Sequence, residues 1–82
     1  MADLPRIYFD SNAATGDGRY ILSIQGSLRD IRSLGDSLHP GMRVLLYMTD
    51  ELEVEATLEL DSERQIWLGL PDDSTLRVLG EP

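Results

Sequence analysis

The sequence contains no cysteine and no lysine, and it has one histidine, His39. Without cysteine, the chain can form no disulfide, no thiolate nucleophile and no cysteine-ligated zinc site, which fits a reducing compartment. Without lysine, it has neither a Schiff-base amine nor the phosphate-binding lysine of nucleotide loops. His39 precedes Pro40 at an expected turn and has no second imidazole with which to share a metal ion. We therefore expect no cofactor and no metal.

Long apolar runs are also missing. No stretch approaches the roughly 18 apolar residues of a membrane span, and residues 1–5 lack the basic and apolar regions of a signal peptide. The sequence thus predicts a cytoplasmic protein with no membrane partner. Its 82 residues predict a single small globular domain, 1–82, with little room for a deep catalytic cleft. We expect a protein that is not an enzyme.

The charge balance is acidic, with fifteen acidic residues against seven arginines and a net charge of -8. This charge opposes a phosphate backbone at distances inside the Debye length, so no nucleic-acid partner is expected. Asp36, Ser37 and His39 have the residue types of a catalytic triad. They lie within four residues on one loop, a spacing from which triad geometry is seldom reached.

Apolar and polar residues alternate most clearly over residues 51–61, which predicts a strand with one wet face. Residues Arg43–Met48 are largely apolar on both parities, as is typical of a central strand that is covered on both faces. Shorter strands are predicted at residues 6–9, 19–25, 65–70 and 75–79.

One short helix is predicted after Gly26. Ser27 is placed to cap it, and Leu28, Ile31 and Leu34 have the spacing of one apolar stripe. Gly35 is suited to the left-handed residue that ends a helix. A helix of about two turns cannot stand alone, so we expect it to lie on a sheet.

Together these elements predict a mainly β (α+β) fold: a small antiparallel, partly open barrel of five to six strands, with one short helix between strands 2 and 3. From Pro40 to Leu79 the chain has three closely spaced hairpin strands, a tight turn at Pro71 and a final short strand. This order resembles the general pattern of SH3-like barrels. The resemblance rests on pattern alone and implies a fold, but no functional residue.

The register follows from pairing inner residues with inner residues through the shortest loops. A three-residue loop after Met48 pairs Met48 with Leu52. A three-residue loop after Asp61 pairs Leu60 with Ile66. One face then becomes an aliphatic core, in which we expect Leu46, Val54, Leu58 and Leu68 to meet.

The opposite face is acidic and aromatic, and in this register Trp67 lies on it beside Glu59. Its larger apolar side chains call for a cover, which is either the helix or another chain. This candidate interaction face comprises Arg43, Leu45, Tyr47, Glu53, Glu55, Glu59 and Trp67. Its carboxylates are expected to repel one another, so that mild acid or salt stabilises the fold.

The best functional hypothesis is a non-enzymatic protein-interaction module that uses this face to bind a protein partner or a second copy of itself, as in a homodimer. The alternative is an acidic decoy or inhibitor of a nucleic-acid-binding protein, with carboxylates standing where phosphates would lie. Two plainer interpretations stay open. The acidic row is also typical of a solvated strand face, and Trp67 is also suited to packing inside its own domain.

Overall fold

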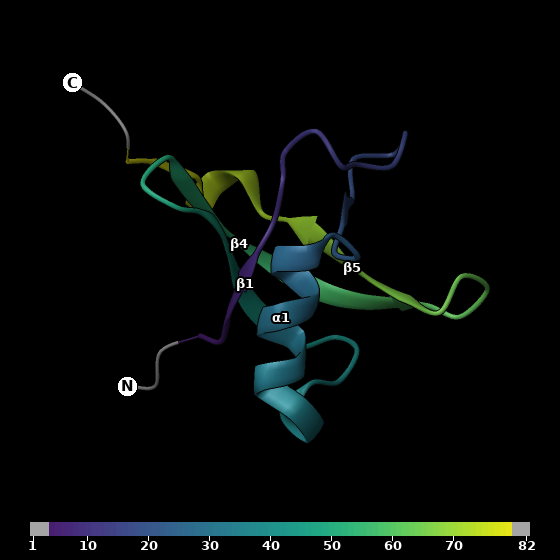
Figure 1. The fold of residues 1–82 in the computed structure, drawn as a ribbon. Coiled ribbons are helices and arrows are strands. Elements are labelled where there is room, and N and C mark those ends of the chain that lie inside the picture. Colours follow the sequence, from purple (N-terminus) through teal and green to yellow (C-terminus); the bar gives the residue numbers. More distant parts are fainter. Residues whose placement is uncertain (1–3, 80–82) are drawn as a thin grey trace.

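Six strands in one curled sheet, together with one helix, make up the fold of residues 4–79, which a computed structural model describes (Figure 1). The strands are β1 (Arg6–Tyr8), β2 (Tyr20–Ile21), β3 (Arg43–Met48), β4 (Leu52–Asp61), β5 (Ile66–Pro71) and β6 (Arg77–Val78). Helix α1 (Gln25–Leu34) lies between β2 and β3, and short 3-10 helices η1 (Gly35–Ser37) and η2 (Asp73–Thr75) follow α1 and β5. This is the expected mainly β, SH3-like, partly open barrel.

The sheet has the strand order β1-β3-β4-β5-β2, and β6 pairs with the first residues of β4. All of these pairs are antiparallel except β1 with β3, which is parallel. Parallel neighbours need a long crossover connection, and here β2 and α1 supply it. The wholly antiparallel sheet that we expected from the sequence therefore needs this one correction.

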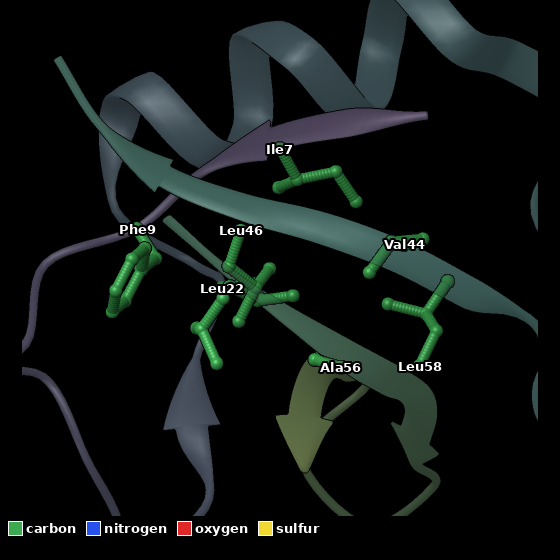
Figure 2. Close-up of a cluster of buried hydrophobic side chains, with 8 residues drawn as sticks. Ile7, Phe9, Leu22, Val44, Leu46, Ala56 and Leu58 are labelled. Carbon is green, nitrogen blue, oxygen red and sulfur yellow. The ribbon is translucent and has the colours of Figure 1, made fainter. Parts of the chain in front are cut away.

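The hydrophobic core lies on one side of β3 and β4, which we call the core face (Figure 2). Its buried cluster comprises Ile7, Phe9, Leu22, Val44, Leu46, Val54, Ala56 and Leu58. The predicted core positions Leu46, Val54 and Leu58 are confirmed. Leu68 is also buried, at 8% exposure, but it pairs with Glu59 and so lies on the opposite face of the sheet.

The β3–β4 hairpin has the register predicted from the sequence, with Met48 opposite Leu52 and Leu46 opposite Val54. Asp50 occupies the left-handed region at φ 59°, which lets the chain reverse within a short turn. The strict alternation of β4 decides this register, because a slip of one residue would turn its acidic side chains into the core.

The β4–β5 hairpin differs from the prediction by one residue. Leu60 lies opposite Trp67 and Leu58 opposite Gly69, because Gln65 adopts φ 60° and extends the loop. Both parities of β5 are apolar, so the hydrophobic pattern does not select a register there. Steric crowding on the core face does favour one register. A Cβ atom on Gly69 would lie 2.9 Å from Leu46 Cδ1, so glycine is suited to this crowded position on the core face.

Helix α1 begins earlier than expected, and Leu28 is not among the residues that it packs against the core. Its N-cap residue is Ile24, and no side chain caps it, so the prediction that Ser27 caps the helix is wrong. Leu28 is 42% exposed, whereas Ile31 and Leu34 pack against the core.

Small residues explain how α1 docks. Ser27 is fully buried in the first turn of α1, and its hydroxyl donates a hydrogen bond to the Tyr8 carbonyl. A Cβ atom on Gly26 would lie 2.6 Å from Tyr8 Cδ2, so only a glycine allows this close approach. Gly35 ends α1 with the expected positive φ, 58°, but its ψ of -131° lies outside the left-handed helical conformation that the sequence predicted. No helix among residues 4–79 has the length and apolar character needed to cross a membrane.

Candidate functional site

The face of the sheet opposite the core, which we call the outer face, carries six of the seven residues of the predicted interaction face. Tyr47 lies opposite Glu53, Leu45 opposite Glu55, and Arg43 opposite Thr57, as their parity predicts. Glu59 has the same parity along β4.

Trp67 is the exception. The shifted register of β5 places it opposite Leu60, on the core face, where the half-buried ring packs against the core cluster. The placement of Trp67 beside Glu59 is therefore wrong, and Leu68 occupies that position. Of the two interpretations that the sequence left open, packing inside its own domain describes this ring.

The carboxylates of the outer face are paired with arginines. Arg43 lies 3.3 Å from Glu55 and 2.7 Å from Asp72, and Arg19 Nε lies 2.5 Å from Glu59. Attraction within these pairs offsets the repulsion expected along the acidic row.

Glu53 is the most enclosed of these carboxylates, with its side chain 12% exposed. Arg6 from β1 and Arg77 from β6 approach it at 3.5 and 3.2 Å. Because their strands lie on opposite sides of the β3–β4 pair, the Arg6–Glu53–Arg77 bridge spans the outer face.

Tyr47 is held at the junction of the outer face and α1. Its hydroxyl donates to Asp30 Oδ2 over 2.8 Å, and the same oxygen accepts the Tyr8 amide at 2.9 Å. The Tyr8 and Tyr47 rings meet edge to face with centres 5.7 Å apart, and Arg6 Cζ lies 4.7 Å from the Tyr47 ring centre. Burial, followed by the hydrogen bond to Asp30, raises the pKa of the Tyr47 hydroxyl. The helix thus holds Tyr47 through Asp30.

A hollow of about 440 Å³ opens on the outer face beside Leu45. Leu4 and Leu45 are its apolar residues, and Thr75 closes one side because its hydroxyl oxygen accepts the Glu55 amide at 2.8 Å. The full lining is Leu4, Arg6, Leu45, Glu53, Glu55, Thr75 and Arg77. Three predicted residues, Leu45, Glu53 and Glu55, therefore meet around one concave surface.

Four lining residues were not predicted from the sequence. Leu4 and Arg6 reach the hollow through the parallel β1–β3 pair, while Thr75 and Arg77 return to it through η2 and β6. No periodic signal marks these long-range approaches, because each depends on where a short segment rejoins the sheet.

Among residues 4–79, no group of three or more His, Asp or Glu side chains is arranged to hold a metal ion. His39 is exposed in the connection between η1 and β3. Comparisons with protein-family models, curated proteins and solved structures yield no match to this chain.

Proposed function

We propose that this protein is an interaction module that binds a protein partner through the hollow at Leu45. The observation that carries the proposal is an apolar floor, Leu4 and Leu45, inside a rim of charged side chains that the Arg6–Glu53–Arg77 bridge already holds in place. Apolar centres with polar rims are characteristic of protein interfaces. A rim ordered before binding loses less side-chain entropy when a partner arrives.

The exposure of the rim favours a protein partner over a small molecule. The Arg6 and Arg77 side chains stay 54% and 71% exposed, as interface rims do, whereas small-molecule sites enclose most of their ligand's surface. We also propose that the partner is met in the cytoplasm, because a chain without cysteine gains nothing from an oxidising compartment.

The structure gives less support to the decoy hypothesis. A surface that imitates a row of phosphates must present unpaired carboxylates to the basic groups of its target. Here Glu53, Glu55 and Glu59 each have an arginine partner within the same chain. An incoming basic surface would have to displace those arginines first.

Affinity capture with matched variants tests the proposal. Leu45→Glu places a charge in the floor of the hollow. Leu70→Glu serves as the control, because Leu70 is an exposed residue of β5 outside the hollow. We expect the wild-type chain and Leu70→Glu to retain the same bound protein from a lysate and Leu45→Glu to lose it, with melting temperatures confirming that all three are folded.

Equal capture by the Leu45→Glu and wild-type chains would overturn the proposal. Light scattering of the purified chain across a hundredfold dilution, about the range needed to see mass action, identifies the partner type. A mass that falls on dilution means that the partner is a second copy, and a constant monomer mass means that it is a different protein.

A further inference from the structure

The solvent-exposed side of α1 carries two arginines and forms a hollow without acidic residues, although the chain as a whole is acidic. This second hollow, of about 680 Å³, is lined by Ser23 and by five residues of α1: Gln25, Gly26, Leu28, Arg29 and Arg32. We call Leu28, Arg29 and Arg32 the helix stripe. Helix α1 lies on the near side of the molecule in Figure 1, and Ser27, Ile31 and Leu34 face the interior. The helix stripe therefore faces away from the core.

The arginines of the helix stripe have few acidic partners among residues 4–79. Among residues 4–79, Arg32 is the one arginine without an ion-pair partner. Arg29 pairs with one acid, Asp30, at 3.4 Å, also lies beside the Tyr47 hydroxyl, and its side chain stays 68% exposed. Asp30 also accepts hydrogen bonds from the Tyr47 hydroxyl and the Tyr8 amide. Arg29 therefore shares the Asp30 carboxylate with two other donors. Positive charge is thus available at the helix stripe in a chain of net charge -8.

Leu28 adds an apolar contact next to these charges. It is 42% exposed and lies one helical turn before Arg32, so the two side chains share one side of α1. An exposed leucine beside two arginines offers a partner both apolar area and positive charge within one hollow.

We propose that the helix stripe docks an acidic segment of a partner protein, with one apolar side chain of that segment on Leu28 and its carboxylates on Arg29 and Arg32. Charge complementarity favours this occupant, because the helix stripe presents arginines without acidic residues among the lining of its hollow. A long polyanion fits less well, since beyond the two arginines it would meet the acidic remainder of the chain. This site is separate from the hollow at Leu45 and does not depend on the function proposed there.

A titration followed by amide chemical shifts tests the proposal on the full chain. The probe is a capped pentapeptide with two acidic residues on each side of a leucine, compared at low salt with peptides carrying amides for the acids or alanine for the leucine. We expect the acidic leucine peptide to shift the amides of residues 23–32. The double variant Arg29→Gln/Arg32→Gln should bind about tenfold more weakly. Arg64→Gln is the matched control, because Arg64 is an exposed arginine at the β4–β5 turn.

Three outcomes would overturn the proposal. The first is equal binding of the acidic and amide peptides, which would remove the role of charge. The second is equal loss of binding in Arg64→Gln and in the double variant, which would reduce the effect to net charge. The third is a nucleic-acid oligomer that shifts the same amides more strongly than the peptide does. Loss of capture by Leu45→Glu would leave these results unchanged, so the two sites are tested independently.

Discussion

The two faces of the sheet are built from the same strands but hold different kinds of interaction. On the core face, Val44, Leu46 and Leu58 are fully buried. On the outer face, Glu53 and Glu55 are tied to arginines that stay largely exposed. Burying a leucine is worth several times more than an exposed ion pair, which contributes about 0 to 1 kcal/mol. The fold therefore depends mainly on the core face, and the partner that we propose would meet the outer face.

The largest effect should come from Leu58→Ala, which opens a cavity in the centre of the core face. We expect the free energy of unfolding to fall by about 2 to 5 kcal/mol, enough to unfold a domain of this size. Denaturant titration measures the change, and Leu70→Ala on the outer face is the control, since Leu70 is 38% exposed. Equal losses in the two variants would remove the distinction between the faces.

Trp67→Ala should destabilise the chain by about 2 to 3 kcal/mol, less than the loss of a fully buried ring, because the half-buried Trp67 packs against the core cluster. Since the ring packs within its own chain, the loss should not change with protein concentration. Melting curves across a hundredfold dilution, about the range that exposes mass action, check this. A loss that grows on dilution would mean that Trp67 belongs to an interface.

Ser27→Ala should cost about 1 to 2 kcal/mol, because it removes the buried hydroxyl that donates to the Tyr8 carbonyl and leaves that carbonyl without this partner. Ser33→Ala, at an exposed position of α1, is the matched control and should leave the unfolding free energy nearly unchanged. Thermal unfolding of both variants provides the measurement. An equal effect would show that helix propensity, and not the contact with β1, holds Ser27 in place.

The smallest expected effect is the pH dependence of stability that arises from the outer-face ion pairs. Hydrogen bonds from Ser74, followed by that from Arg43, lower the pKa of Asp72 from its ordinary value of 3.8. A carboxylate with a lowered folded-state pKa contributes stability above its unfolded pKa, and this contribution is lost as the pH falls through the folded-state pKa. We expect Asp72→Asn to lower the free energy of unfolding slightly at neutral pH. Below the folded-state pKa of Asp72, the variant and the wild type should be equally stable. A gap between the two chains that widens in acid would contradict the Arg43–Asp72 pairing.

The contrast between the core face and the outer face also explains how far the fold could be predicted from the sequence. The β3–β4 register was predictable because β4 alternates strictly, so a slip would bury its carboxylates. The β4–β5 register was not predictable, because Ile66, Trp67 and Leu68 place apolar side chains on both faces of β5. The positive φ of Gln65, which shifts the register, is not visible in the hydrophobic pattern. Ser27 was misassigned because a serine at a predicted helix start is typical of a cap, whereas here it permits close packing on β1.

The candidate site was predictable only where it lies on the regular strands. Alternation along β3 and β4 placed Leu45, Glu53 and Glu55 together, since parity is a local property of a strand. The rim residues Arg6 and Arg77 come from short segments near the two ends of the chain, and their approach to Glu53 depends on long-range pairing. Such pairing is decided by packing, which no local pattern records.

Site-specific photo-crosslinking tests most directly whether the outer face meets a partner. A photoreactive side chain replaces Leu45 in the outer-face hollow or, in a second protein, Leu60, a 45% exposed residue with core-face parity. After irradiation in a lysate, we predict one discrete crosslinked protein from position 45 and none from position 60. Crosslinking from position 60 alone would contradict the account, because the partner would then meet the face that we assign to the fold.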